Sequence, residues 1–367
     1  MARGTAEIDL GAIRRNFAVL DAVASGSLLC AVVKANGYGH GMVPVANAAL
    51  EGGASWLAVA AASEALELRE AGFGSPILVM GSVESGEVPD LVGSGCDLVV
   101  WTDEALGWAT DATGLARVHV KLDSGMGRLG TRDHALALSL AEQAEADPGA
   151  ELVGVTTHFA TAELEDQAFL EQQNSLFSQF SDSVKHFAPN VLAHAANSAA
   201  TLARADTHHD MVRCGVAIYG LDPFQLDPST WGLDPAMRLT SSIASVELAQ
   251  AGDTVGYGRN FKAERPTWIA TVPVGYADGI SRHLGGRADC LVGGRRVPIV
   301  GNVSMDNIAL DLGTETEAEV GDQVVLLGRD GEQLVLAEEW ATAAGTINYE
   351  IATGIGGRTE FVHRSHK

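Results

Sequence analysis

Several short apolar runs in this sequence are followed directly by a polar side chain that could take part in chemistry. The first is "AVVKANGYGHG" (Ala31–Gly41), in which Lys34 follows apolar residues. The chain has only five lysines among 367 residues, and a second one, Lys121, also follows an apolar run. The full set contains cations, a histidine, an amide, a hydroxyl and a glycine turn: Lys34, Lys121, Arg128, His158, Asn197, Ser198, Arg213, Gly215 and Val216.

This combination of residue types points to carbonyl and phosphate chemistry. A lysine amine forms a Schiff base with an aldehyde when it is neutral, and burial or nearby cations lower its pKa towards that state. Two arginines in the set would have this effect on Lys34. Ser198 and the backbone N–H groups at Gly215 and Val216 suit a phosphate group. A reactive lysine with a phosphate site indicates pyridoxal 5′-phosphate, with a class I aldolase or a sugar-phosphate isomerase as alternatives.

Each of these residues also has a purely structural explanation. A lysine at a strand end is often solvated, and His158 alone could be a hydrogen-bonded core residue. The segment "SGMGRLG" around Arg128 could be no more than a turn. The placement of the whole set at corresponding strand ends favours a functional site.

The elements that must carry these side chains are short runs rich in Val, Ile and Leu, typical of parallel strands buried on both faces. Helix-like segments separate them, such as Ala62–Phe73, Thr131–Asp147 and Leu164–Phe187. This alternation predicts a (β/α)8 barrel of the TIM type, whose active sites lie at the carboxyl ends of the strands. An open doubly wound sheet is the alternative, but no G-x-G-x-x-G motif follows the first run. The eight runs begin at Leu28, Trp56, Ile77, Asp97, Arg117, Leu152, Val191 and Met211.

A change in the pattern of residues after about residue 220 indicates a second domain. The segment Gly220–Pro235 contains three Asp-Pro steps, which interrupt helices and strands. Beyond it the chain consists of short β-like runs and glycine turns, and only Leu336–Gly345 looks helical. We therefore predict a barrel domain over residues 1–228 and a mostly β domain over 229–367. The prediction leaves open that residues 1 to about 10 pair with the second domain.

Composition excludes several classes of protein. With 46% hydrophobic and 19% charged residues, the chain is expected to be globular. Its net charge of −23 and the lack of a basic stripe argue against a nucleic-acid partner. No export signal or membrane-spanning run is present, and the four cysteines lack metal-ligand spacing. We expect a cytoplasmic protein with reduced thiols, no metal site and a small-molecule substrate.

A series of ordered motifs, spread over almost the full length, resembles the alanine racemase family. The motifs are "TAEIDLGAIRRN", "AVVKANGYGHG", "VKLDSGMGRLG", "TTHFATAE", "HAANSAAT", "VRCGVAIYG", "DTVGYGRNF", "VPVGYADGISR", "VPIVGNVSMDN" and "INYEI". The resemblance implies interconversion of L- and D-alanine with pyridoxal phosphate, which supplies D-alanine for peptidoglycan. It also implies a homodimer with shared active sites, in which the β domain contributes to the partner subunit's site.

The resemblance further implies a role for individual residues. Lys34 would hold the cofactor and act as the base on one face of the substrate, and Tyr257 from the partner subunit would act on the other face. Arg213 would face the ring nitrogen, where an arginine can only donate a hydrogen bond. Arg128, with His158 beside it, would stabilise the phenolate of Tyr257. The remaining cofactor ligands would be Tyr38, His158, Asn197, Ser198, Gly215, Val216 and Tyr349.

Substrate binding and access are implied in the same way. Arg128 and the backbone of Met305 would bind the substrate carboxylate, supported by Asp306 and by Lys121, which the family often carbamylates. Three positions depart from the family pattern: Asn302 replaces the usual arginine, Glu163 the usual aspartate, and Cys214 the usual proline. The first two belong to the family's substrate entrance, so we expect a looser outer gate with the reaction unchanged. The entrance residues are Glu163, Tyr276, Arg282, Asn302 and Ile347.

Three other functions compete with alanine racemisation. An amino-acid racemase of broader specificity is the nearest. A fold-related amino-acid decarboxylase shares the architecture and cofactor, but its separate poly-glycine phosphate loop and catalytic cysteine motif are not found here. A non-catalytic pyridoxal-phosphate carrier would be a lone barrel, and the length of the chain argues against it.

Overall fold

The computed structural model describes residues 3–24 and 26–365. Eight parallel strands pair in chain order, and the last pairs with the first to close a barrel. This confirms the predicted (β/α)8 barrel and excludes the open sheet. Every residue of the second, third and fourth barrel strands is buried, as expected for strands covered on both faces. The barrel strands are β2 (Leu28–Val32), β3 (Trp56–Val59), β4 (Ile77–Val79), β5 (Asp97–Val100), β6 (Ala116–Lys121), β7 (Ala150–Thr156), β8 (Leu192–His194) and β9 (Met211–Cys214).

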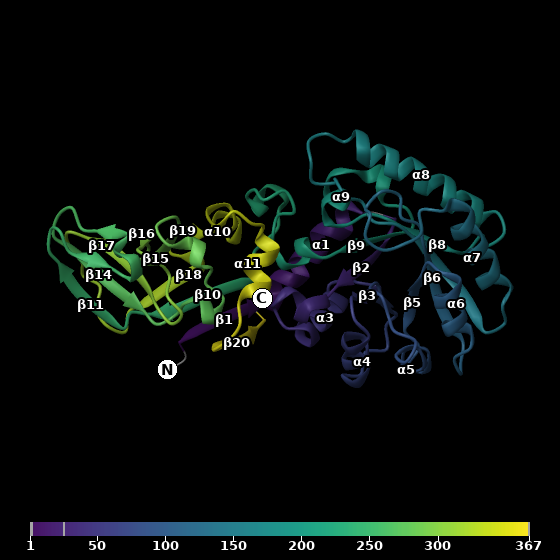
Figure 1. Cartoon of the computed structure of the whole chain (residues 1–367), viewed down its shortest axis with the longest axis horizontal. Helices are drawn as coiled ribbons and strands as arrows, with labels where there is room; N and C mark the ends of the chain where they lie inside the picture. Colours follow the sequence, from purple (N-terminus) through teal and green to yellow (C-terminus); the bar gives the residue numbers. More distant parts are fainter. Residues whose placement is uncertain (1–2, 25, 366–367) are drawn as a thin grey trace. The chain divides into compact units, whose positions relative to one another are not determined.

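Helices cover the outside of this barrel, and Figure 1 shows α4 to α8 arranged around the strands. Side chains just before two of the helices accept backbone N–H groups of the first turn: Thr102 caps α6, and Asp133 caps α7. The longest helix, α8, buries Phe177 and Phe180. The helices are α1 (Leu10–Val23), α3 (Met42–Glu51), α4 (Ala62–Glu70), α5 (Val88–Gly93), α6 (Asp103–Thr110), α7 (His134–Ala146), α8 (Ala168–Lys185) and α9 (Ser198–Ala203).

The later part of the chain is mostly β structure, as predicted. Its main sheet has the order β11-β14-β17-β16-β15-β18-β10-β1-β20, with β19 paired to β18, and a separate ribbon pairs β12 with β13. The strands are β1 (Gly4–Asp9), β10 (Met237–Ser242), β11 (Ser245–Ala249), β12 (Thr254–Val255), β13 (Phe261–Lys262), β14 (Thr267–Val272), β15 (Asp289–Val292), β16 (Arg295–Val300), β17 (Ile308–Gly313), β18 (Gln323–Asp330), β19 (Gln333–Val335) and β20 (Thr359–Arg364).

The sequence predicts one helix in this part, and that prediction is incomplete. Besides α10 (Ala337–Ala344), the structure has α11 (Asn348–Gly354). The motif "INYEI" contains β-branched and aromatic residues and therefore does not look helical. Tertiary hydrogen bonds decide the outcome: Asn348 Nδ2 donates to Glu338 Oε1 (2.7 Å) and to the carbonyl of Asp222 (2.8 Å).

The chain divides into two compact units. The described part of the barrel unit comprises residues 14–24, 26–37 and 42–218, and that of the β unit comprises 3–13, 38–41 and 219–365. Strand β1 belongs to the β unit because it pairs with β10 and β20. The segment 219–228, assigned to the barrel from sequence, also lies in the β unit, where Asp222 N donates to Glu338 Oε1 (2.9 Å).

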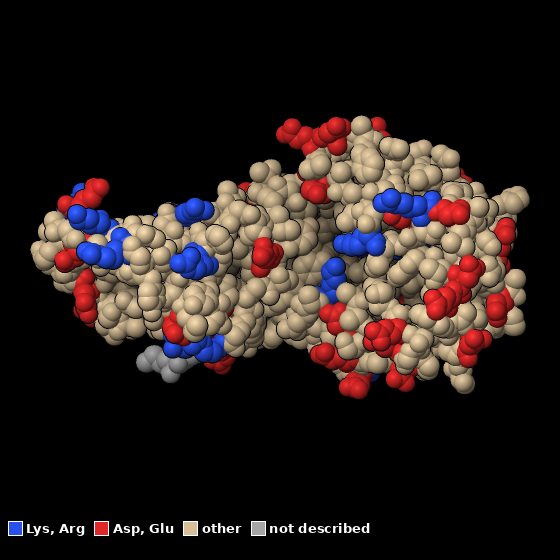
Figure 2. Space-filling view, in the orientation of Figure 1, with Lys and Arg blue, Asp and Glu red and all other residues tan. Residues whose placement is uncertain are grey.

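The charged side chains on the surface are mostly acidic (Figure 2), as the net charge of −23 predicts. Figure 2 shows acidic side chains spread over the barrel unit, with basic side chains scattered among them. Within 3–24 and 26–365, no helix has the length and apolar character needed to cross a bilayer. Cys30, Cys96, Cys214 and Cys290 are all buried free thiols.

Candidate active site

Lys34 lies at the start of an unusual backbone turn that follows strand β2. The next residues, Ala35, Asn36, Gly37 and Tyr38, have φ values of 52°, 51°, 61° and 51°, so the turn α2 (Lys34–Tyr38) is left-handed. A left-handed conformation costs an ordinary L-residue about 1–2 kcal/mol. Such strain persists only where neighbouring groups hold it, and it is typical of functional sites.

Hydrogen bonds from the barrel unit hold this turn. Glu64 Oε1 accepts from Ala35 N (2.6 Å), while its Oε2 accepts from Ala60 N (2.9 Å). Asn36 Oδ1 accepts from Met42 N at 3.0 Å. Glu64 is a supporting residue that the sequence analysis missed. Its signal was its place in the first turn of α4, where an acid usually caps its own helix.

Burial and nearby positive charge act on the amines of both predicted lysines, Lys34 and Lys121. Burial lowers the pKa of Lys34, and the positive charge of Arg128 lowers it further, although Glu64 opposes the shift. Burial also lowers the pKa of Lys121 to about 8, with the charges of Arg213 and Arg128 adding to the effect. Both lysines therefore have more neutral amine near neutral pH than a solvated lysine has. This is the state that carbonyl chemistry and carbamylation both require.

Arg213 lies inside the barrel, and both of its terminal nitrogens make hydrogen bonds. It is 5% exposed, and burial lowers its pKa to about 10, so it stays protonated at neutral pH. Its NH2 group donates to the carbonyls of Thr157 (2.7 Å) and Ala195 (3.0 Å), and its NH1 group donates to Thr156 Oγ1 (3.1 Å). These bonds fix the plane of the guanidinium.

The structure brings His158 close to four of the predicted cations. Burial lowers the pKa of His158 well below its usual value, and the charges of Arg213, Arg128, Lys121 and Lys34 reinforce the shift. The ring is therefore neutral, and its Nδ1 lies 3.3 Å from Arg213 NH2. The sequence analysis expected His158 to add to the stabilising effect of Arg128. A neutral His158 adds no positive charge and can contribute only a hydrogen bond, so the arginines carry the charge.

A donor site lies at the carboxyl ends of β8 and β9. The Ser198 hydroxyl, 4% exposed, accepts hydrogen bonds from Gly215 N (3.0 Å) and Ala217 N (3.3 Å). Since both of its lone pairs are used, its own proton can only be donated to another acceptor. Asn197 caps α9 by accepting from Ala200 N at 3.0 Å. A phosphate oxygen is the kind of acceptor that this donor set fits.

The β unit brings the two predicted phosphate tyrosines together. Tyr38 stacks on Tyr219 with ring centroids 4.9 Å apart, and the Tyr38 and Tyr349 centroids are 6.1 Å apart. Tyr349 lies in α11, the helix that the Asn348 hydrogen bonds hold in place. The extra helix therefore positions a predicted ligand.

The segment that carries Tyr257 is exposed, and Asn302 is hydrogen-bonded to its backbone. Tyr257 is 76% exposed and begins a short 3₁₀ turn between two glycines, Gly256 (φ 73°) and Gly258 (φ 76°). Asn302 Nδ2 donates to the Tyr257 carbonyl (2.7 Å), and Asn260 Nδ2 donates to Asn302 Oδ1 (3.1 Å). Asn302 thus contacts the loop of the predicted second base, a contact that the family departure did not suggest.

Other predicted residues of the β unit also lie at its surface. Met305 is 53% exposed, Ile347 48% and Tyr276 45%, while Arg282 is exposed. Asp306 Oδ1 accepts from Arg358 NH1 at 2.7 Å. In the barrel unit, Glu163 and Arg128 are exposed, and Val216 is buried. Large apolar side chains left exposed in one chain are the kind of surface that a partner covers.

Both parts of the chain are similar to known proteins. Residues 8–223 match the family model for the alanine racemase N-terminal domain, and residues 236–363 match the C-terminal domain. The alanine racemase of Symbiobacterium thermophilum is 40% identical over 359 residues, covering 96% of this chain and 95% of the relative. That of Beutenbergia cavernae is 41% identical over 366 residues, covering 98% and 97%.

Solved structures agree as well. The crystal structure of alanine racemase from D-cycloserine-producing Streptomyces lavendulae has a TM-score of 0.94 and 40% identity, covering 100% of this chain and 98% of that one. The alanine racemase of Bacillus anthracis with bound L-Ala-P has a TM-score of 0.91 and 38% identity, covering 100% and 96%. The chain therefore belongs to the alanine racemase family.

Proposed function

We propose that this protein interconverts L-alanine and D-alanine with pyridoxal phosphate in the cytoplasm, and so supplies D-alanine for peptidoglycan. The observation that carries the proposal is Lys34, which has a lowered pKa, lies on a strained left-handed turn and shares the barrel unit with Arg128, Ser198 and Arg213. Members of the alanine racemase family depend on this cofactor, and the barrel unit offers the donors that it needs.

The residues fit the cofactor group by group. Lys34 would bind its aldehyde through the neutral amine, and Ser198 would donate its remaining proton to the phosphate, together with the backbone N–H of Val216. The Gly215 N–H, which donates to Ser198 Oγ at 3.0 Å, would hold that hydroxyl in place. The family pattern adds Tyr38 and Tyr349 as phosphate ligands, and Asn197 and His158 near the ring. When bound, the cofactor withdraws electrons from the substrate's α-carbon and makes its C–H bond acidic.

The protein's own groups then decide where protons go. Lys34 holds or releases the α-proton on the face that leads to D-alanine, and Tyr257 of the partner subunit serves the opposite face. Arg213 would face the ring nitrogen, where an arginine can only donate, so that nitrogen would stay without a proton and the cofactor would withdraw electrons less strongly.

Substrate binding uses a second set of groups. Arg128 binds the carboxylate, with the backbone of Met305 and the side chain of Asp306 as support. Lys121 is suited to carbamylation, since a neutral amine adds to CO₂ and releases one proton, and its pKa of about 8 makes that amine available. The resulting anion would orient Arg128.

A homodimer with shared sites accounts for the exposed side chains of the β unit. Tyr257, Met305, Tyr276 and Ile347 are all exposed in the single chain. The partner would cover them while receiving Tyr257 into its own site. A lone-barrel carrier and a decarboxylase lose support, because both domains match racemase models. A broader-specificity racemase remains the second candidate, on the departures at Asn302 and Glu163.

The first test concerns the cofactor lysine. Borohydride reduction of the cofactor-loaded protein, followed by peptide mapping, is expected to place the pyridoxyl group on Lys34. Lys121 is the matched control, because it lies in the same barrel unit and its pKa is also lowered. A label on Lys121, or none on either lysine, would contradict the assignment.

The second test separates two roles for Asn302. Asn302→Ala removes the hydrogen bond to the Tyr257 carbonyl and is expected to lower kcat about two- to tenfold in both directions, the usual effect of one hydrogen bond. Asn302→Arg restores the family's usual residue and is expected to change KM and the kcat/KM ratio of alanine to serine and a longer substrate.

The two variants are judged separately. Unchanged kcat in Asn302→Ala contradicts an anchoring role for the loop. Identical specificity ratios in Asn302→Arg contradict a role at the entrance. Glu163→Asp, which restores the other family residue without touching the Tyr257 loop, is the matched control for entrance effects.

A further inference from the structure

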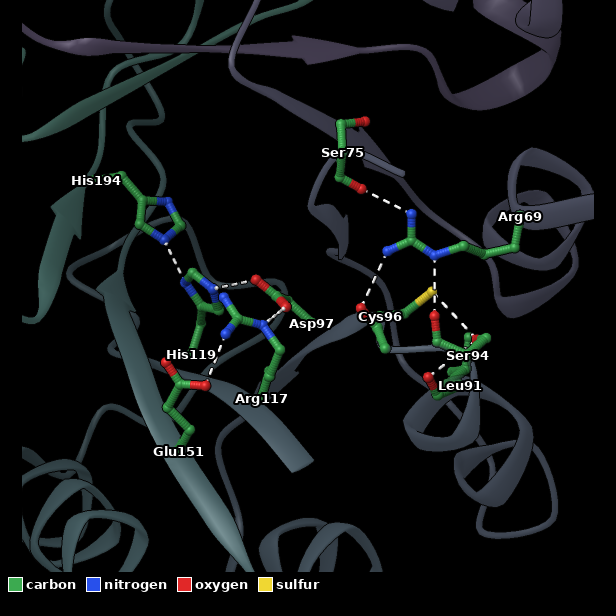
Figure 3. Close-up of polar contacts among 11 residues, drawn as sticks. Arg69, Ser75, Leu91, Ser94, Cys96, Asp97, Arg117, His119, Glu151 and His194 are labelled. Carbon is green, nitrogen blue, oxygen red and sulfur yellow. Dashed lines mark hydrogen bonds and ion pairs between the residues drawn. The ribbon is translucent and has the colours of Figure 1, made fainter. Parts of the chain in front are cut away.

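A line of buried polar side chains crosses the interior of the barrel and ends on Arg213. Arg213 NH1 lies 2.7 Å from His194 Nδ1, and His194 Nε2 lies 2.8 Å from His119 Nδ1. His119 Nε2 lies 3.3 Å from Asp97 Oδ2. Figure 3 shows the outer part of this line, from His194 through His119 to Asp97. We name Asp97, His119 and His194 the barrel relay.

The barrel relay is completely shielded from solvent. Asp97, His119 and His194 are each 0% exposed. A buried carboxylate needs a counter-charge, and Arg117 supplies it by donating from Nε to Asp97 Oδ1 at 2.6 Å. Arg117 also pairs with the exposed Glu151 at 2.6 Å, at the amino-terminal ends of the strands. The relay therefore runs from that end of the barrel to the guanidinium near the opposite end.

The groups at the two ends of the relay determine which nitrogen of each histidine carries the proton. Arg213 can only donate, so His194 Nδ1 must accept and the proton of this neutral ring sits on Nε2. Burial and Arg213 both lower the pKa of His194 well below its usual value, in agreement with a neutral ring. His194 Nε2–H then donates to His119 Nδ1, and His119 Nε2–H donates to the Asp97 carboxylate. No other arrangement satisfies all three contacts.

Packing holds the His119 ring in the orientation that this chain requires. The rings of Trp56 and His119 form a T-shaped pair, with centroids 5.6 Å apart and an interplanar angle of 86°. A Cβ at Gly154 would lie 2.3 Å from His119 Nδ1, so the ring occupies space that only glycine leaves open. A buried ring with both nitrogens bonded has no alternative position.

We propose that Asp97 and His119 are positioning residues for Arg213, acting through His194. Asp97 sets the tautomer of His119, which sets the tautomer of His194 and presents a lone pair to the guanidinium. Without that lone pair, Arg213 loses one of the bonds that fix its plane, and its direction towards the cofactor ring is no longer determined. The role of Arg213 at the cofactor ring rests on the proposed function. The hydrogen bonds of the barrel relay do not depend on it.

The relay can be tested without the cofactor. In ¹⁵N-histidine-labelled apo-protein, NMR is expected to show both His119 and His194 protonated on Nε2 and bare on Nδ1. Single His119→Gln and His194→Gln variants assign the two signals by their loss. A proton on Nδ1 of either ring would overturn the relay, whatever the protein does with pyridoxal phosphate.

The effect on Arg213 is tested with the cofactor. His119→Leu removes both bonds, whereas His119→Gln can accept from His194 and donate to Asp97 with one side chain. We expect His119→Leu to weaken pyridoxal phosphate binding to the apo-protein, to shift the absorbance of the bound cofactor, and to lower kcat per loaded site about tenfold. His119→Gln should recover most of the loss.

Two further variants complete the design. Asp97→Asn keeps an oxygen acceptor for His119 and should be milder than Asp97→Leu. Glu151→Gln disturbs only the exposed end and should match the unmodified protein. His119→Leu protein that folds and retains normal cofactor affinity, absorbance and kcat per loaded site would overturn the proposal. Failure of the unmodified protein to bind pyridoxal phosphate would instead contradict the proposed function and leave the tautomers to be judged by NMR.

Discussion

The substitution Tyr257→Phe is expected to lower racemisation of alanine in both directions by about 10²–10⁴-fold, the usual contribution of a positioned acid–base group. Net conversion needs a proton to leave one face and arrive at the other, so loss of either base blocks both directions. Pyridoxal phosphate binding should be unchanged, because the phenyl ring remains and Tyr257 lies in the exposed loop of the β unit. Circular dichroism of alanine and cofactor titration measure the two effects.

Exchange of the α-proton with solvent makes this test more specific. In D₂O, the Tyr257→Phe variant should still exchange the α-proton of D-alanine through Lys34, but not that of L-alanine. Tyr219→Phe is the matched control, since Tyr219 is a buried tyrosine whose ring stacks on Tyr38 and Phe preserves that stack. Equal exchange of both enantiomers in Tyr257→Phe would show that this tyrosine is not the base for L-alanine.

Two inactive variants are expected to regain activity when their subunits are exchanged. Lys34→Ala lacks one base and Tyr257→Phe lacks the other. If each site takes Lys34 from one chain and Tyr257 from its partner, a mixed dimer has one site with both groups intact. Random exchange of equal amounts should then restore about one quarter of the unmodified activity, because half the dimers are mixed and each has one working site.

The alternative arrangement gives the opposite result. Were both bases supplied by one chain, no site in a mixed dimer would contain Lys34 together with Tyr257, and activity would stay at the background of the separate variants. Exchange between two separately tagged Lys34→Ala preparations is the control. Isolation of the mixed dimer by its two tags ensures that lack of recovery reflects the site and not failed exchange.

The eight barrel strands were predictable from sequence because each is short and built mainly around apolar residues that must be covered on both faces. Runs such as Trp56–Val59 and Ile77–Val79 are almost wholly Val, Ile, Leu, Ala or Trp, and local composition is enough to identify them. The candidate residues followed from the same prediction, since in a closed parallel barrel the groups after each strand share one end. The roles of individual residues came from the resemblance of the motifs to the alanine racemase family.

Only the tertiary structure decided how those residues are held. Local preference opposes the left-handed turn at Ala35 and Tyr38, and the hydrogen bond from Ala35 to the distant Glu64 helps to maintain it. Alternation along β6 does not reveal which side chain His119 meets, because its partners Asp97 and His194 come from two other strands. Likewise, Asn302 reads as an altered entrance residue until its contact with Tyr257 is seen. Local sequence encodes the elements, whereas contacts between distant segments encode the orientation of the groups they carry.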